Sequence, residues 1–365
     1  MSAAAPLSVV EDAVRPLARV IADELRPLVR RIDEEGLYPS KVMRALGAAG
    51  AYSHHHSGAG AKGDLFPAIE AMAEVGATCI STAFCVWCQD ALVWYLENTQ
   101  NSALRERHLD AAASGDMLGG TGLSNPMKAM AGFEPLALKG VPVSGGYRVT
   151  GRLPYVSNIE DGHRFGTVFG VEGQPERRIM ALLQAGHNGV SLAQNAHFIA
   201  LEGSATYSVL VRDAFVPEAD ILSDDAAAFI PKIRKGFVLL QSGMGIGAAR
   251  GAAASMRNDS VGRRLAAHLP LGPDAIDARC DALLERIREH AQGPQETDRA
   301  AFLDILRTRL DVSWLALEAA QAAVLQHGAR GYLAGSEVSR RFREAQFVAI
   351  VTPSVKHITA ELAKG

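Results

Sequence analysis

The residue patterns of the 365-residue chain predict an α+β protein with an N-terminal helical domain, a central small antiparallel β domain and a C-terminal four-helix bundle. Three observations lead to this prediction. Apolar residues recur at spacings of three and four in the first third, short β-branched runs separated by glycine fill the middle, and long helical patterns return afterwards. We place the boundaries at residues 1–116, 117–225 and 226–365.

The composition excludes several classes of protein. A hydrophobic content of 48% can fill a large core, and a net charge of -3 argues against a nucleic-acid partner. Four cysteines do not form a disulfide framework, which favours a reducing compartment. The N-terminus lacks the basic start of a targeting peptide, and no stretch reaches the roughly 18 apolar residues of a membrane helix. We therefore expect a cytoplasmic protein with no membrane partner.

Four helical patterns make up the N-terminal third. The first contains Val9, Val10, Val14, Leu17, Val20, Ile21, Leu25 and Leu28 at helical spacing. The second begins near Pro39 and stops at Gly47 and Gly50. The third covers Leu65 to Val75 and the fourth runs from about Thr82 to Glu97.

Short strands and turns make up the middle of the chain. Ser144–Gly146 is typical of a hairpin turn between strands at Leu138–Val143 and Tyr147–Thr150. The other predicted strands are Gly166–Val171, Ile179–Leu183 and Ser208–Val211.

The last third is predicted to be helical again. The expected helices are Ile230–Met256, Ala275–Ala291, Thr297–Gly328 and Glu337–Thr352, with Pro353 ending the fourth and a short helix starting at Ser354.

Five segments carry a resemblance to a known family. Gly122–Pro126 stands where the family has T-E-P-G-x-G-S-D, and Val149–Asn158 matches V-x-G-x-K-x-W-I-T-N. Val211–Leu222 matches F-x-D-V-x-V-P-x-x-x-x-L most closely, and Gly328–Tyr332 resembles G-G-x-G-F/Y. Arg343–Ala345 resembles R-D-A. In this order and at this spacing, the segments resemble the acyl-CoA dehydrogenase superfamily over nearly the whole chain.

The resemblance implies an FAD cofactor and names residues that would bind it. Leu123 and Ser124 would approach the pyrimidine side of the flavin, Tyr155 would pack on the ring where the family has Trp, and Ser157 would hydrogen-bond near N5 where the family has Thr. Gly328 would contribute to the cofactor site, and a homodimer or homotetramer is implied. Without the flanking motifs, Tyr155 would be interpreted as a strand aromatic and Ser157 as a turn residue.

The chain departs from the family at the catalytic base. The family's Glu lies about nine residues after R-D-A, and this position falls on Thr352. Some members place the Glu on the first C-terminal helix, but the segment Phe237–Met244 has only Gln241 as a sizeable polar side chain. Neither a hydroxyl nor an amide is a base at neutral pH. His357 lies six residues beyond Val351 and is interpreted as an exposed helix residue.

A second departure concerns subunit contacts. After Gly247 the helix before a Val261-Gly262 pair is about five residues shorter than in the family. In the family, an Arg in this region reaches the FAD of a neighbouring subunit. The nearby arginines Arg257, Arg263 and Arg264 do not align with it, so the sequence leaves open whether the chain forms the family's usual tetramer.

Other motifs are better explained by structure than by chemistry. The consecutive His54, His55 and His56 cannot easily share one metal ion, and we expect no metal site. Cys85 and Cys88 form a CxxC within a helix and are expected to be buried small residues. The glycines of Met244–Gly251 lie inside a helical stretch, which favours close helix packing over a phosphate loop.

Three hypotheses for function follow. The first is an FAD-dependent oxidoreductase that acts on an acyl-CoA or related thioester with a non-standard base, for example by eliminating a substituent. The second is a flavin-dependent monooxygenase or oxidase of the same fold. The third is a non-catalytic subunit that pairs with an active homologue, although the retained aromatic and hydroxyl at Tyr155 and Ser157 argue against it. The acyl group and the electron acceptor are left open.

Overall fold

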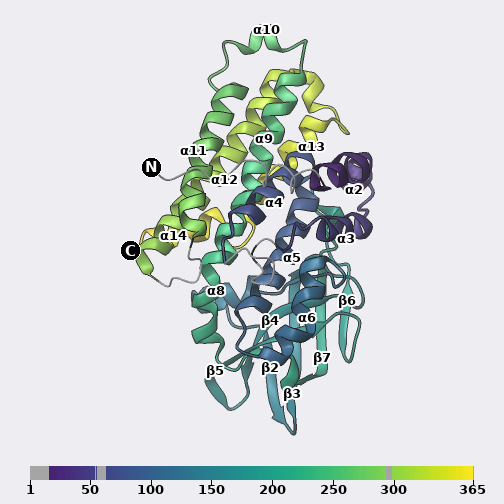
Figure 1. Ribbon diagram of the computed structural model, residues 1–365, viewed down its shortest axis with the longest axis vertical. Coiled ribbons are helices and arrows are strands. Elements are labelled where there is room, and N and C mark those ends of the chain that lie inside the picture. Colours follow the sequence, from purple (N-terminus) through teal and green to yellow (C-terminus); the bar gives the residue numbers. More distant parts are fainter. Residues whose placement is uncertain (1–15, 54, 56–62, 293–297, 365) are drawn as a thin grey trace, which may run out of the picture.

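The computed structural model describes residues 16–53, 55, 63–292 and 298–364, and shows an elongated molecule with a sheet at one end and a helical bundle at the other (Figure 1). The short helix α10 (Arg263–Ala266) lies at the tip of the bundle, farthest from the sheet. The three-part order predicted from the sequence is confirmed.

The N-terminal region is helical, as predicted. Val9, Val10 and Val14 of the first predicted helix lie outside the described residues. The described part of that helix changes from a π-helical turn to a 3₁₀ turn at Pro27, which lacks an amide hydrogen. The helical segments of this region are η1 (Val20–Leu25), η2 (Arg26–Leu28), α2 (Val29–Glu34), α3 (Ser40–Ala48), α4 (Phe66–Thr78), α5 (Ile80–Asn98) and α6 (Ser102–Ser114).

The middle of the chain forms one eight-stranded sheet. Seven strands follow the order β6-β7-β3-β2-β4-β5-β8, and β1 pairs with β4. Most pairs are antiparallel as predicted, while β4 pairs in parallel with β1 and β2. The strands are β1 (Gly119–Thr121), β2 (Leu138–Val143), β3 (Gly146–Val156), β4 (Arg164–Val171), β5 (Gln174–Gln184), β6 (Val190–Ala193), β7 (Tyr207–Pro217) and β8 (Ile221–Ser223), with the short helix α7 (Ser124–Met130) and the 3₁₀ turns η4 (Glu202–Ser204) and η5 (Glu218–Asp220).

The predicted hairpin is confirmed, but its turn is one residue shorter than Ser144–Gly146, because Gly146 already belongs to β3. Val143 pairs with Gly146, so Ser144 and Gly145 form the two-residue turn. Gly145 has φ +78°, a conformation that glycine adopts without steric cost. The short helix α7 after β1 was not predicted, because its seven residues span too few turns to show a periodic pattern.

The C-terminal helices differ from prediction in two places. The expected single helix Ile230–Met256 is two helices, α8 (Ala226–Leu240) and α9 (Ser242–Asn258), separated at Gln241. Gln241 keeps helical dihedral angles, and its side chain makes tertiary contacts that a periodic pattern does not show. The remaining elements are α11 (Pro273–Ala291), α12 (Arg299–His327), η6 (Gly328–Tyr332), α13 (Glu337–Ile350) and α14 (Val355–Leu362).

The second difference is the end of α13, which stops at Ile350 and not at Thr352. Val351 has an extended ψ of 140°, and Pro353 restricts Thr352 and offers no amide hydrogen. Thr352 therefore lies in a short connection between two helices. None of the described helices is both long enough and apolar enough to cross a membrane.

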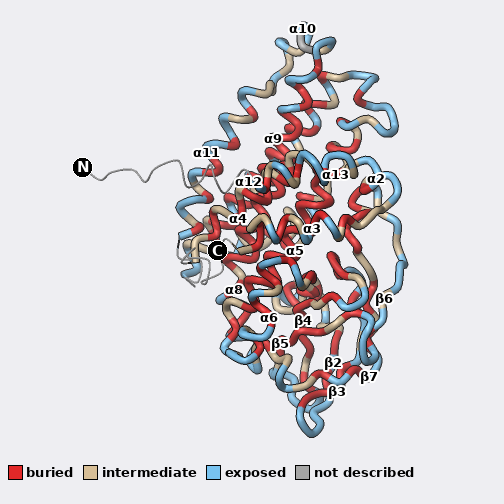
Figure 2. Tube along the Cα trace, turned by 45° about the vertical axis from the view of Figure 1, so that its right-hand side comes forward, coloured by how far each residue is buried: buried red, intermediate tan, exposed pale blue. Residues whose placement is uncertain are grey.

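The helices share one hydrophobic core that extends from Leu17 to Ile358, whereas the inner faces of the strands form a second, smaller core. Figure 2 shows buried residues running continuously through α4, α5, α9 and α12.

A stripe of glycines on α9 brings this helix against α4. A Cβ at Gly243, Gly247 or Gly251 would lie 2.6 to 2.7 Å from the carbonyl oxygens of Ile69, Ala73 and Ala77 respectively, closer than real Cβ atoms approach. The three glycines are four residues apart and so occupy one helix face. The prediction that these glycines serve close helix packing is thus confirmed.

The glycine stripe predicts the effect of adding one methyl group. Gly247→Ala should lower the free energy of unfolding by about 1–3 kcal/mol, because the new methyl group overlaps backbone that cannot move aside cheaply. The measurement is urea-induced unfolding followed by circular dichroism. Ala254→Leu is the matched control, since Ala254 is exposed on the same helix and should accept the added volume. Equal stability of Gly247→Ala and the native protein would contradict this packing.

Candidate functional site

Two hydroxyl groups far apart in sequence meet between the sheet and the bundle. The Oγ of Ser124, the first residue of α7, lies 3.1 Å from the Oγ1 of Thr352, in the connection after α13. Ser124 is a predicted cofactor-binding residue, and Thr352 occupies the position predicted for the catalytic base. The structure therefore brings these two predicted positions into direct contact.

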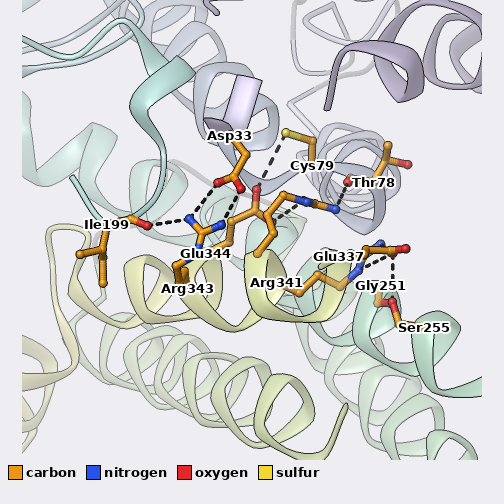
Figure 3. A network of polar contacts seen from close by, with 11 residues as sticks. Asp33, Thr78, Cys79, Ile199, Gly251, Ser255, Glu337, Arg341, Arg343 and Glu344 are labelled. Atoms are coloured by element: carbon orange, nitrogen blue, oxygen red, sulfur yellow. Dashed lines mark hydrogen bonds and ion pairs between the residues drawn. The ribbon is translucent and has the colours of Figure 1, made fainter. Parts of the chain in front are cut away.

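Arginines on α13 fix the helix that leads to Thr352 (Figure 3). Arg343 donates to both carboxylate oxygens of Asp33 on α2, one at 2.9 Å, and to the carbonyl of Ile199 at 2.6 Å. Arg340 binds Glu344 at 2.7 Å and the carbonyl of Thr78 at 3.2 Å. The helix is thus attached to α2, to the end of α4 and to the loop before η4.

The Glu337 carboxylate attaches the start of the same helix to α9. It accepts hydrogen bonds from Arg341 Nε at 2.9 Å and from Ser255 Oγ at 3.0 Å. Figure 3 shows Arg341 beside Gly251, whose missing side chain leaves room for the guanidinium.

A buried guanidinium is linked to the Thr352 segment by hydrogen bonds. Arg309 on α12 is 1% exposed, and its Nε donates to Gln241 Oε1 at 3.1 Å. Gln241 in turn donates from Nε2 to the Thr352 carbonyl at 2.8 Å. The two Nη atoms of Arg309 donate to the Ser313 hydroxyl and to the Val348 carbonyl. Each of these partners is a neutral oxygen.

Burial lowers the pKa of Arg309 to about 10, so its guanidinium stays protonated at neutral pH. A positive charge therefore lies one amide group away from Thr352. A buried charge raises the local electrostatic potential, because the interior screens it less than water does. This arrangement favours negative charge near the two hydroxyls.

An exposed aromatic ring and a buried hydroxyl lie two residues apart at the end of β3. Tyr155 is 55% exposed, an unusual value for a large strand aromatic, and its ring contacts Phe198 edge-on at a centroid distance of 5.8 Å. Ser157 follows two residues later, just beyond the end of β3, and is only 8% exposed. An isolated bridge pairs Ser157 with Thr121, which links the end of β3 to the segment that leads into Ser124 three residues later.

The remaining predicted cofactor residues lie differently. Leu123 has a buried side chain, and its amide donates to Thr121 Oγ1 at 3.3 Å. Gly328 lies at the tip of the bundle, where its neighbour Gln326 contacts Gly262 just before α10. The sheet is at the opposite end of the molecule (Figure 1). Within one chain, Gly328 is therefore not part of the site at Tyr155 and Ser157.

Three other candidate residues, His357, Cys85 and Cys88, pack against neighbouring residues. The ring of His357 stacks on Phe133 with a centroid distance of 4.5 Å, and burial lowers the pKa of His357. This histidine is half-buried and not exposed as expected. Cys85 and Cys88 are free and buried as predicted, and burial raises the pKa of both thiols, which makes them poor nucleophiles.

The histidine cluster offers no metal site in the part of the chain that the structure describes. His54 and His56 lie outside the described residues, and His55 is buried 3.5 Å from Asp90 on α5. Among the described residues, no three His, Cys, Asp or Glu side chains gather as ligands.

Sequence comparisons relate the chain to one family. The profile described as "Acyl-CoA dehydrogenase, N-terminal domain" matches residues 10–116. The benzylmalonyl-CoA dehydrogenase of Aromatoleum aromaticum is 24% identical over 60% of each chain. The probable acyl-CoA dehydrogenase YngJ of Bacillus subtilis is 23% identical over 93% of each chain.

Solved structures share the whole fold. The butyryl-CoA dehydrogenase of Megasphaera elsdenii superimposes with a TM-score of 0.85 at 16% identity, over 100% of this chain and 99% of that one. PigA, solved as an FAD complex, superimposes with a TM-score of 0.81 at 16% identity, over 100% and 98%. Residues 10–116 thus match the acyl-CoA dehydrogenase family model, and the whole chain shares the fold of the solved acyl-CoA dehydrogenases. The resemblance inferred from the five motifs is confirmed.

Superfamily motifs revealed some of this site and missed other parts. Arg309 was missed, because one arginine in a long amphipathic helix gives no sign that it is buried. Two threonines were missed as well, because isolated threonines are common at strand ends: Thr121, which bridges Ser157, and Thr206, whose Oγ1 donates to Ser157 Oγ at 2.7 Å. The spacing of Thr352 after the R-D-A-like segment was the signal that placed the base position.

Removal of the Gln241 amide tests the link between Arg309 and Thr352. Gln241→Leu should lower the free energy of unfolding by about 2–4 kcal/mol, because it leaves a buried guanidinium N–H without an acceptor. Gln241→Glu should lower the free energy of unfolding less, because a carboxylate still accepts a hydrogen bond from Arg309. Urea-induced unfolding measures both effects.

The control for this test is Gln346→Leu, since Gln346 is half-buried and its side chain makes a long 3.4 Å hydrogen bond to the Phe342 carbonyl. A Gln241→Leu variant no less stable than this control would show that the Gln241 bridge contributes little.

Proposed function

We propose that this chain is an FAD-dependent oxidoreductase that acts on an acyl-CoA or related thioester without a carboxylate base at the superfamily position. The observation that carries the proposal is the exposed Tyr155 ring two residues before Ser157, whose backbone bridges Thr121 in the segment leading to the Ser124–Thr352 pair. The superfamily relatives named as CoA dehydrogenases support the thioester, and the FAD complex of PigA supports the cofactor.

The residues of the site fit a flavin. A flat heteroaromatic ring needs an apolar surface to pack on and hydrogen-bond partners for its polar edge. Tyr155 exposes its ring two residues before Ser157. The Ser157 oxygen already accepts a hydrogen bond from Thr206 Oγ1 at 2.7 Å, which leaves the Ser157 hydrogen available for a ligand atom. FAD would supply the two-electron acceptor that none of these side chains provides.

The remaining residues would orient the substrate and set the local charge. The hydroxyls of Ser124 and Thr352 can each donate or accept one hydrogen bond, which suits a carbonyl oxygen of a thioester. Arg309 donates to Gln241, and Gln241 donates to the Thr352 carbonyl. The positive charge of Arg309 therefore favours negative charge that develops near Thr352. Gly328 would contact the cofactor only from a second copy of the chain, which agrees with the proposed homo-oligomer.

The second candidate is a flavin-dependent monooxygenase or oxidase. One observation favours it: the contacts of Thr352 are a hydroxyl and an amide, and neither can remove an α-proton. Oxygen chemistry on a reduced flavin needs no such base, so this site could serve it.

The visible spectrum of the purified protein tests the flavin. We expect flavin absorption bands and released FAD, or uptake of added FAD by the colourless protein. Tyr155→Ala should weaken FAD binding about tenfold, because stacking on an aromatic ring contributes on the order of 1 kcal/mol or more. Val143→Ala is the control, since Val143 is an exposed apolar residue of the sheet in the hairpin. A protein that binds neither oxidised nor reduced FAD would support the non-catalytic subunit.

A second experiment separates the two candidate reactions. Anaerobic mixing with acyl-CoA thioesters should bleach the flavin bands if the chain oxidises thioesters. Rapid reoxidation by oxygen with a transient absorbance, and no bleaching by thioesters, would favour the monooxygenase.

Installing a carboxylate tests the position of Thr352. Thr352→Glu should gain α,β-dehydrogenation of acyl-CoA thioesters, because it places a base where the superfamily carries one. The measurement is anaerobic flavin bleaching across several acyl chain lengths. Thr359→Glu, at an exposed position of α14, is the control and should gain nothing. No gain at Thr352 for any chain length would contradict its placement at the base position.

A further inference from the structure

We propose that Ser204, Thr206 and Ser157 form a hydroxyl relay that reverses its direction with the redox state of the bound flavin, with Thr206 as the positioning residue. The inference rests on the proposed function, because it needs a flavin against Ser157. It assigns a role to two residues that the motif comparison did not single out.

The three hydroxyls form a continuous chain of short hydrogen bonds. Thr206 Oγ1 donates to Ser157 Oγ at 2.7 Å, and Ser204 Oγ lies 2.7 Å from Thr206 Oγ1. Ser204 Oγ lies 2.6 Å from the Leu201 carbonyl, to which it can donate when it does not donate to Thr206. The chain thus begins at a carbonyl, which can only accept, and ends at Ser157, two residues after the exposed Tyr155.

The loop that carries the relay is held in an uncommon conformation. Leu201 and Ala205, on either side of η4, have φ of +66° and +46°. This left-handed region costs roughly 1–2 kcal/mol for a residue with a Cβ. Such strain persists only where surrounding contacts impose it, and it is concentrated at functional sites.

Backbone contacts tie this loop to the residues after Ser157. The amides of Asn158 and Ile159 donate to the carbonyls of Ser204 and Ala205 at 2.9 and 3.2 Å. The Asn158 side chain accepts from Tyr38 at 2.7 Å and donates to the Gly119 carbonyl at 2.6 Å. The relay is therefore fixed to the helical region, to β1 and to the end of β3, and its three oxygens cannot easily separate.

Each hydroxyl can donate one hydrogen, so the chain has two complete arrangements. In the first, Ser204 donates to Thr206, Thr206 donates to Ser157, and the Ser157 hydrogen points out of the relay. In the second, an outside N–H donates to Ser157, and the hydrogens run from Ser157 to Thr206, from Thr206 to Ser204 and from Ser204 to the Leu201 carbonyl. Only hydroxyl rotation separates the two arrangements.

The two arrangements match the two forms of a flavin. N5 of the oxidised ring is a hydrogen-bond acceptor, whereas N5 of the reduced ring carries a hydrogen and is a donor. A single hydroxyl facing N5 would leave its own hydrogen buried without an acceptor in the reduced form, and such a group is costly. Thr206 supplies that acceptor, so Ser157 can serve both forms.

The test compares FAD affinity in both redox states. Thr206→Val should weaken binding of reduced FAD about tenfold more than binding of oxidised FAD, because only the reduced form needs Thr206 as an acceptor. For a two-electron couple, this ratio corresponds to a midpoint potential about 30 mV lower. Fluorescence titration under anaerobic conditions gives both dissociation constants, and a redox titration gives the potential independently of turnover.

Three further variants complete the experiment. Thr206→Ser keeps a hydroxyl and should restore the dissociation constants of oxidised and reduced FAD. Ser204→Ala should, like Thr206→Val, weaken the binding of reduced FAD more than that of oxidised FAD, because it removes the acceptor for Thr206. Thr150→Val makes the same kind of change on β3, at a hydroxyl that accepts from the Asp213 amide, and should leave the potential unchanged.

The outcomes separate the relay from the proposed function. Thr206→Val and Ser204→Ala could instead weaken the binding of oxidised and reduced FAD equally. Thr206 would then have a structural role only, and the relay would be overturned while the flavin assignment stands. If Thr206→Val does not fold, Ser204→Ala decides between these results. A native protein that binds FAD in neither redox state would overturn the proposed function together with the relay.

Discussion

The guanidinium of Arg309 is the group on which the arrangement of the site depends. It lies in the core of the bundle and its hydrogen bonds reach three places: the junction of α8 and α9 at Gln241, its own helix at Ser313, and the end of α13 at Val348. A buried cation with neutral partners tolerates little displacement, because each lost acceptor leaves a charged donor without a hydrogen-bond partner in either solvent or protein. The one-residue break at Gln241 and the position of Thr352 both follow from satisfying this group.

The sequence predicted the fold well where a periodic or turn signal was local. The hairpin at Ser144 and Gly145 was predictable because two-residue turns need a residue that tolerates positive φ. The long helices were predictable from apolar spacing. The break at Gln241 and the short helix from Ser124 were not, because the first depends on Arg309, 68 residues away, and the second is too short to show a period.

The site was predictable only in part, and mainly through the superfamily resemblance. Spacing after the R-D-A-like segment identified Thr352, and the motif around Gly122 identified Ser124, but only the fold shows that their hydroxyls meet. The supporting groups escaped prediction because their roles depend on which atoms they face. Arg309 looks like any solvated helix arginine, and the Ser204 and Thr206 pair looks like an ordinary approach to a strand.

The glycine stripe on α9 constrains where the length of this chain can vary. At Gly243, Gly247 and Gly251 the backbones of α9 and α4 meet directly, with no side chain between them to adjust. Inserting or deleting one residue inside this segment would rotate the following glycines by about 100° out of the interface. Gly251 also leaves room for Arg341, so the rotation would displace α13 as well. A change in helix length is therefore compatible with the fold only beyond Gly251, towards the α10 tip.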